Sequence, residues 1–292
     1  MPLAEHSVFR RPAKEQVLWR YMNFPKFASM ITTKTLWFSN MHTLSVDDPY
    51  EGILPAGNYA HRQWNNEADV PQKILNDIKR GNFIGKGGDI NSHIKAYKAL
   101  LDNEVDEAYN ARKENYINCW HISSYESASM WHIYGERQFG IAVTSDINSI
   151  AKAFNATKEE IFAGSVDYID YESETLDMSN GFIPALHKRL SFGHEKEMRL
   201  LIWDFSDSEM DVLFPLNGTL RVMKGERPKA ERDKINPAPG KAVGCDLSEL
   251  ILGIYVSPAS PIWFEDAVRS FCELARIDKR IVRSDLLAGP VR

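Results

Sequence analysis

The residues of this chain with the clearest chemical potential are two glutamates and an arginine at alternate positions. Glu195, Glu197 and Arg199 occur in the sequence FGHEKEMRLLIW, which ends in an apolar run. Side chains alternate across a strand, so the spacing predicts that these three share one face while Met198 and Leu200 are buried on the other. Carboxylates beside a guanidinium can hold or deprotonate a polar substrate, which makes this face a candidate functional cleft. The same pattern also fits an amphipathic edge strand with a solvated ion pair.

A mixed set of helices and strands must position that face. Strand patterns occur at 17–21, 35–39, 116–123, 140–144, 161–168, 195–203, 212–216, 219–223, 250–256 and 281–283. Helical patterns occur at 24–31, 92–114, 128–134 and 184–190, and after an N-cap at Ser260. We therefore predict an α+β fold: a mixed, mainly antiparallel split sheet flanked by helices. It would form a single domain over 1–292 with a helical insertion at 53–115, and residues 224–239 would form an irregular loop.

Composition restricts the class of protein. The chain has 292 residues and a formal net charge of −5, so no overall basic field recruits nucleic acid, although local contacts with nucleic acid stay open. No apolar run is long enough to cross a membrane, and the first fifteen residues lack the apolar core of a secretory signal. Cys119, Cys245 and Cys272 are odd in number and widely spaced, which favours the reducing cytoplasm.

The order of several short motifs resembles a bacterial family known as domain of unknown function 2971. The motifs, which span nearly the whole chain, are LWRY at 18–21, LWFS at 36–39, DDPYE at 47–51, CWHIS at 119–123, SMWHIY at 129–134, E-x-E-x-R at 195–199 and LILG at 250–253. Asp47 departs from the family, which more often has Asn there. A negative charge at that position would alter turn hydrogen bonding or repel an anionic ligand. The family name implies no activity.

The order of polar residues is also similar to that of the ADP-ribosyltransferase fold. Such enzymes bind NAD in a cleft between two small sheets. The resemblance implies Arg20 on an early strand, Ser123 or Tyr134 in the centre, and Glu195 with Glu197 on a later strand. It therefore implies NAD as the substrate.

The expected roles of these residues follow from glycosidic bond cleavage. Breaking the nicotinamide–ribose bond develops oxocarbenium character, which the carboxylate of Glu197 would stabilise. Glu195 would hold or deprotonate the acceptor, and Tyr134 would stack on nicotinamide. Trp131 and Arg199 are expected as further NAD contacts, although a buried core position is the ordinary place for such a tryptophan.

Asp48, Glu51 and His121 complete the predicted substrate cleft. A second hypothesis uses Asp48, Glu51, Glu195 and Glu197 as a Mg²⁺ site in a phosphodiester-cleaving effector. We nevertheless predict no metal, because the usual order of acidic residues is absent. A third hypothesis is a non-catalytic binding or sensor module. The leading expectation is a cytoplasmic bacterial effector or defence protein that consumes NAD, with an unknown macromolecular or small-molecule acceptor and an open oligomeric state.

Overall fold

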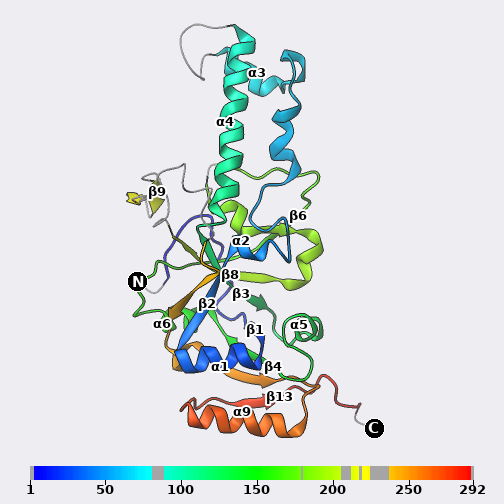
Figure 1. Cartoon of the computed structure of the whole chain (residues 1–292), viewed down its shortest axis with the longest axis vertical. Helices are drawn as coiled ribbons and strands as arrows, with labels where there is room; N and C mark the ends of the chain where they lie inside the picture. Colours follow the sequence, from blue (N-terminus) through cyan, green and yellow to red (C-terminus); the bar gives the residue numbers. More distant parts are fainter. Residues whose placement is uncertain are drawn as a thin grey trace.

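A nine-stranded sheet forms the body of the protein (Figure 1). The computed structural model describes residues 3–80, 89–178, 180–204, 212–216, 219–223 and 237–290, with 212–216 and 219–223 in their backbone only. Seven strands follow one another in the order β11 (Gly240–Gly244), β2 (Thr35–Asn40), β3 (Asn115–Ile122), β1 (Leu18–Asn23), β4 (Gly140–Ser145), β12 (Gly253–Val256) and β13 (Ile281–Arg283). Off this path, β8 (Glu197–Trp203) pairs with both β3 and β5 (Phe162–Ser165).

The sheet is mixed and mainly antiparallel, so the predicted α+β class is confirmed. Among the described strand pairs, β12 runs parallel to β13, as does β6 (Asp167–Ile169) to β7 (His187–Arg189) outside the main sheet. One edge of β3 is paired with β8 along its whole length, from Asn115 to His121. Two strands share the other edge of β3: β2 pairs with the start of β3, and β1 pairs with the end of β3. The sheet therefore divides at β3.

Helices surround this sheet and extend from one end of it (Figure 1). Those around the body are α1 (Phe24–Thr33), α2 (Met41–Leu44), α5 (Ala128–Ile133), α6 (Ile147–Ala153), α8 (Leu247–Leu250) and α9 (Ile262–Leu274). The arm that projects from the body contains η1 (Ala56–Gln63), η2 (Glu67–Asp69), α3 (Gln72–Lys79) and α4 (Ile90–Ala111). It lies within the range 53–115 expected as an insertion. None of the described helices is both long and apolar enough to span a membrane.

The two faces of β8 have different roles, as the alternation predicts. Met198 and Leu200 are fully buried in the main hydrophobic core, beside the equally buried Trp120 of β3. Glu197 and Arg199 lie on the opposite face, where cross-strand neighbours on β3 are His121 and Cys119. The apolar face therefore fixes the register that brings the charged face to the other side.

Several boundaries differ from the sequence prediction. The helix expected at 184–190 is wrong: a 3₁₀ turn, η3 (Ile183–Leu186), leads directly into β7, because pairing with β6 overrides local helical spacing. The strand expected at 161–168 is divided into β5 and β6, and the one at 250–256 starts only at Gly253, after α8. The helix expected after Ser260 is α9, which begins at Ile262 with Pro261 at the N-cap position, one residue later than the predicted cap.

The strands expected at 212–216 and 219–223 are present as β9 (Val212–Leu216) and β10 (Thr219–Met223), which pair in an antiparallel direction. Most of the loop expected at 224–239 lies outside the described residues.

Candidate functional site

Five buried charged residues from three separate parts of the chain meet on the polar face of β8. We call Glu51, Lys188, Glu195, Glu197 and Arg199 the charged cluster. All five are at most 8% exposed, and Arg199 is completely buried. Burial of this many charges is expensive unless each is paired, so their contacts define what the site can do.

Strand β8 contributes the first ion pair of the charged cluster. Glu197 and Arg199 are two residues apart on one face, and the guanidinium meets the same carboxylate oxygen through Nε at 3.0 Å and Nη2 at 2.9 Å. The Arg199 Nη1 donates to the carbonyl of Ala185 at 2.6 Å. The predicted shared face of Glu197 and Arg199 is therefore confirmed, and the guanidinium is fixed from two sides.

Glu195 reaches the charged cluster by a different route from the one predicted. It is the last residue of η4 (Leu190–Glu195), not part of β8. Lys196, which follows, has a left-handed backbone with φ of 42° and turns the chain into the strand. The Glu195 carbonyl accepts a 2.6 Å hydrogen bond from Nδ1 of His121. This turn directs Glu195 into the charged cluster without strand alternation.

Lys188 of β7 lies between the three carboxylates. Its Nζ is 2.5 Å from Glu195 Oε2, 3.7 Å from Glu51 Oε2 and 3.8 Å from Glu197 Oε2. A single ammonium thus contacts all three glutamates, and the charged cluster has two cations for three carboxyl groups. The sequence prediction missed this residue because 184–190 was interpreted as helix. Nothing in His187-Lys188-Arg189, three basic residues in a row, signals that only the middle one is buried.

The turn after α2 supplies the third carboxylate. Glu51 Oε1 is 2.8 Å from Arg199 Nη2. Gly52 follows with φ of 68°, and a Cβ there would meet the Met41 side chain at 2.7 Å, so the turn needs a glycine at this position. The tight turn directs Glu51 inward, as expected for a residue of the predicted cleft.

Asp48 lies at the edge of the charged cluster, where it pairs with Arg189. We call these two residues the rim pair. Arg189 Nη2 donates to Asp48 Oδ1 at 2.6 Å, with side-chain exposures of 32% and 5%. The Arg189 Cζ lies 4.4 Å from the ring centroid of Tyr50 and 5.3 Å from that of Phe192. At this edge of the site Arg189 therefore reaches solvent, whereas Asp48 remains buried.

Electrostatics divide the carboxylates into two kinds. Burial raises the pKa of Glu51 above its ordinary value, and the attraction of Arg199 and Lys188 does not offset it. Burial also acts to raise the pKa of Glu197, but Arg199 and Lys188 outweigh it and hold that pKa below its ordinary value. Glu197 is thus kept ionised, whereas Glu51 is the carboxyl group best suited to hold a proton.

Polar side chains surround the charged cluster. The Tyr134 hydroxyl donates to Glu195 Oε1, while its ring remains 43% exposed. The Tyr168 hydroxyl accepts a 2.9 Å hydrogen bond from the backbone N–H of Glu197. Burial lowers the pKa of His121, so its imidazole is neutral and donates through Nδ1 to the Glu195 carbonyl. Tyr134 and His121, both predicted site residues, therefore do meet the glutamates.

Arg20 is not brought to the charged cluster. Its cross-strand neighbour is Val143 in the main core, so it projects from the opposite face of the sheet to Trp19 and Tyr21. Its Nη1 donates to the carbonyl of Cys119 at 2.7 Å, at the place where the sheet divides. Burial lowers its pKa. Arg20 thus satisfies an open strand edge instead of facing the glutamates.

Two other predicted NAD contacts have local structural partners. The Ser123 hydroxyl donates to the carbonyl of Tyr125 at 2.6 Å and so forms a turn. Trp131 is 4% exposed, donates through Nε1 to Glu126 at 2.8 Å, and packs edge-on against Tyr21 with ring centroids 5.0 Å apart. The indole is therefore part of a small core under α5.

Unpaired polar atoms gather at this site. Eight buried side-chain polar atoms of the described residues make no hydrogen bond, and four of them belong to the charged cluster and the rim pair. They are Asp48 Oδ2, Glu51 Oε1, Arg189 Nε and Arg199 Nη2. Glu51 Oε1 and Arg199 Nη2 are close enough for an ion pair, but their orientation is outside hydrogen-bond geometry. Buried groups of this kind are normally satisfied, so their concentration makes this face the candidate functional site of the described residues.

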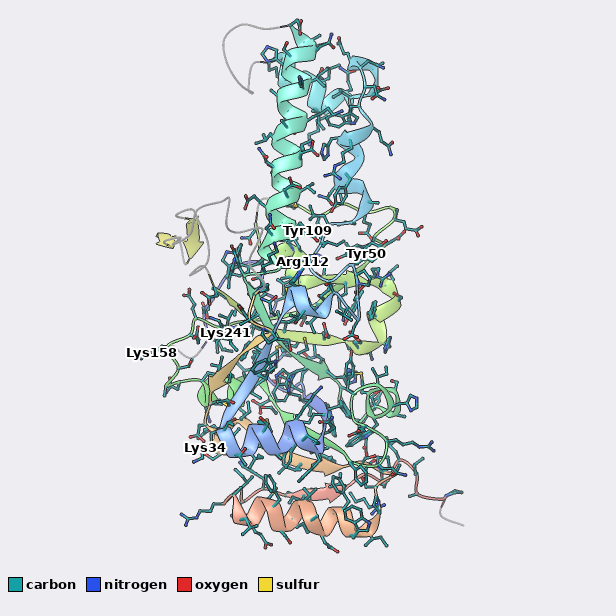
Figure 2. The ribbon with its side chains drawn as sticks, viewed as in Figure 1. Lys34, Tyr50, Tyr109, Arg112, Lys158 and Lys241 are labelled. Carbon is teal, nitrogen blue, oxygen red and sulfur yellow. The ribbon has the colours of Figure 1, made fainter. Side chains whose placement is uncertain are left out.

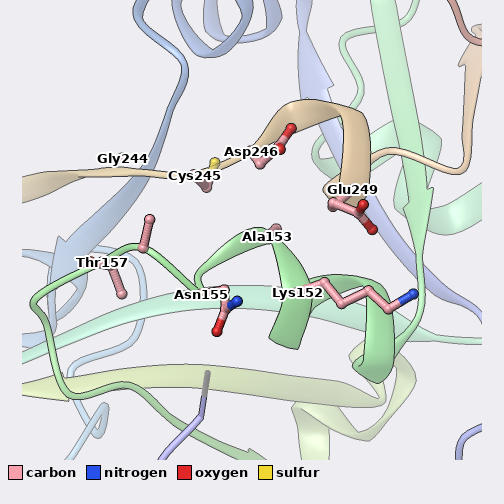
Figure 3. Close-up of a pocket in the computed structure, with 9 residues that line it drawn as sticks. Lys152, Ala153, Asn155, Thr157, Gly244, Cys245, Asp246 and Glu249 are labelled. Carbon is pink, nitrogen blue, oxygen red and sulfur yellow. The ribbon is translucent and has the colours of Figure 1, made fainter. Parts of the chain in front are cut away.

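A cavity of about 570 Å³ lies elsewhere, between the end of α6, the end of β11 and the start of α8 (Figure 3). Lys152, Asn155 and Glu249 are among the polar side chains that line it. Asp246, also in the lining, already accepts from Ser248 as the N-cap of α8. None of its lining residues was predicted as a site residue, and none belongs to the charged cluster.

Comparison of the chain with protein-family models, curated proteins and solved structures found no match. The two family resemblances stay predictions. In the described part of the chain, no group of three or more His, Cys, Asp or Glu side chains has the arrangement of a metal site.

Proposed function

We propose that the charged cluster is the active centre of an NAD-consuming enzyme, with ADP-ribosyltransferase-like or NAD glycohydrolase-like chemistry. The observation that carries the proposal is the convergence of Glu51, Lys188, Glu195, Glu197 and Arg199 on one buried face. Replacing such a network by apolar side chains is often neutral or stabilising, so packing alone gives little reason for it. Strongly perturbed carboxylates with specific charge partners are typical of active sites.

Glu197 has the electrostatic state that this chemistry needs. Cleavage of the nicotinamide–ribose bond develops positive charge on the sugar, and an ionised carboxylate stabilises it. The hydrogen bond from Arg199 Nε and the ion-pair contact from Nη2 hold Glu197 ionised and fixed in position. In this proposal Glu197 contacts the ribose and is the catalytic residue.

Glu195 and Tyr134 act together in the proposed site. One carboxylate oxygen of Glu195 binds Lys188 and the other accepts from the Tyr134 hydroxyl. Glu195 is therefore better suited to position Tyr134 than to remove a proton from an acceptor. The half-exposed ring of Tyr134 would lie against nicotinamide.

Arg20, the NAD contact that the resemblance implies, does not reach this site from its side of the sheet. Arg189 is the arginine of the site with solvent exposure, at 32% of its side chain. We propose that NAD contacts the rim pair in place of Arg20.

The test of this function is nicotinamide release from NAD by purified protein, with and without cell extract as a source of acceptors. Wild type should release nicotinamide, and Glu197→Gln should reduce the rate by about a hundredfold or more, as loss of one oriented electrostatic group typically does. Lys79→Met, which removes an exposed ion pair with Glu67, is the control and should retain the rate. Absence of release from folded wild type under both conditions would reject the proposal.

A non-catalytic binding or sensor module is the second candidate. The observation that favours it is the 8% exposure of Glu197, whose carboxylate is already neutralised by Arg199. Such a protein would gain thermal stability with NAD without consuming it. The phosphodiesterase alternative is less favoured, because the Lys188 ammonium occupies the position between the three carboxylates that a divalent cation would take.

We place the protein in the cytoplasm, where its free Cys119, Cys245 and Cys272 would stay reduced. An effector or defence role would suit an NAD-consuming activity there.

A further inference from the structure

The rim pair contains an unpaired donor and an unpaired acceptor side by side. Arg189 Nη2 is bonded to Asp48 Oδ1 at 2.6 Å, while Arg189 Nε and Asp48 Oδ2 are buried and make no hydrogen bond. Nε belongs to the same planar guanidinium as Nη2, and Oδ2 to the same carboxylate as Oδ1. The two unpaired atoms therefore flank a single hydrogen bond, where arginine and aspartate commonly make two.

Other contacts hold this arrangement in place. Asp48 Oδ1 also accepts from the backbone N–H of Tyr50 at 3.1 Å, which fixes the orientation of the carboxylate. The Tyr50 and Phe192 rings pack against the guanidinium. Asp48 is only 3% exposed, so solvent does not readily supply a hydrogen bond to its second carboxylate oxygen.

We propose that the rim pair is a recognition subsite for a planar group that presents a hydrogen-bond acceptor next to a donor. The acceptor of the ligand takes the hydrogen of Arg189 Nε, and its donor pairs with Asp48 Oδ2. A primary carboxamide has this arrangement, and so has the N1 and N6 edge of adenine. The choice of ligand rests on the proposed function, because NAD contains both groups.

Tyr50 is positioned to control access to the subsite. Its ring lies over Arg189 and is 43% exposed, and Figure 2 shows it near the junction of the arm and the body. Outward rotation of this one side chain would uncover the guanidinium. On its return, the ring would cover a bound planar group and contribute stacking.

The experiment measures direct binding of small probes by calorimetry or ligand-observed NMR, without turnover. Nicotinamide is compared with nicotinic acid, whose carboxylate lacks the donor, and AMP with IMP, whose oxo group replaces the N6 donor. Wild type should bind nicotinamide or AMP at least about tenfold more tightly than its matched analogue. The preferred pair identifies which part of NAD occupies the subsite.

Two conservative variants test the assignment. Arg189→Lys keeps the positive charge but lacks Nε, and Asp48→Asn replaces the acceptor oxygen by a donor in one orientation. Each should remove the tenfold preference while the protein remains folded by circular dichroism. Arg10→Lys, in the exposed pair with Asp167, is the matched control and should keep the preference.

Failure of this inference is separable from failure of the proposed function. Equal binding of each probe to its analogue, or preferences unchanged in both rim variants, would overturn the subsite even if NAD is consumed. Glu197→Gln should retain the probe preference while losing nicotinamide release. Discrimination by a wild type that never releases nicotinamide would support the subsite and reject the enzymatic proposal.

Discussion

Removal of the Lys188 ammonium is the most direct perturbation of the charged cluster. In Lys188→Met the three carboxyl groups of Glu51, Glu195 and Glu197 face Arg199 as their one remaining cation within the cluster. The lysine side chain is 6% exposed, so water cannot replace the lost contacts. Breaking a buried ion pair by deleting one partner typically costs about 3–5 kcal/mol of unfolding free energy.

Lys79→Met is the control for Lys188→Met, because it removes an ion pair with nearly the same distance between nitrogen and oxygen. Lys79 Nζ is 2.6 Å from Glu67, close to the 2.5 Å between Lys188 and Glu195, but Lys79 and Glu67 are 50% and 41% exposed. Exposed pairs contribute about 1 kcal/mol or less. The predicted difference between the two variants therefore comes from burial and not from distance.

The pH dependence supplies an independent check. Loss of Lys188 removes an attraction that lowers the pKa of Glu51 and of Glu197, so both pKa values rise. A carboxyl group whose pKa is raised in the folded state stabilises the fold below its unfolded pKa of about 4.3 and loses this contribution as pH rises. The deficit of Lys188→Met should therefore be largest at pH 8 and smaller at pH 5, measured by urea unfolding. Adding Glu195→Gln should recover part of it. A deficit equal to that of Lys79→Met, or one independent of pH, would refute the coupled network.

The other predictions concern single residues of the same strand and its surroundings. Burial raises the pKa of Glu51, so wild type loses stability as pH rises through the folded-state value, and Glu51→Gln should gain stability relative to wild type between pH 5 and 8 in urea titrations. Glu197→Gln should behave oppositely, because Arg199 outweighs burial and lowers the pKa of Glu197: its deficit at pH 7 should shrink as pH falls below about 4.3. Leu200→Ala should cost about 2–5 kcal/mol of unfolding free energy, since Leu200 is fully buried. Tyr134→Phe should slow nicotinamide release and should cost about 1–3 kcal/mol of unfolding free energy, because it leaves the buried Glu195 Oε1 without its hydroxyl donor.

The sequence predicted those parts of the site that depend on strand periodicity. Glu197 and Arg199 lie on one face of β8 and Leu200 on the other because a two-residue period leaves no alternative once the apolar face is buried. The meeting of Glu51 with this strand was also expected from the need of buried carboxylates for cationic partners. Both inferences use local pattern or charge and need no knowledge of the topology.

The remaining parts of the site depend on topology that a single sequence does not contain. Arg20 is on a strand as expected, but its face is set by pairing with Val143, which lies 123 positions later in the chain. Lys188 enters the charged cluster because β7 pairs with β6, and the local pattern there favours a helix. Lys196 has a left-handed backbone and separates Glu195 from the strand. A glycine or an asparagine at this position would have indicated such a turn in the sequence, but a lysine does not.

The presence of Lys188 among the glutamates bears on which chemistry the site can support. Two or three carboxyl groups in contact without cations would share protons, as in acid–base dyads. Here an ammonium and a guanidinium keep Glu197 ionised, which favours stabilisation of developing positive charge over donation of a proton. Nicotinamide leaves a ribosyl pyridinium as a neutral molecule and needs no acid to protonate it. A centre built around a fixed, ionised carboxylate therefore matches the cleavage of NAD, in which the leaving nicotinamide requires no proton.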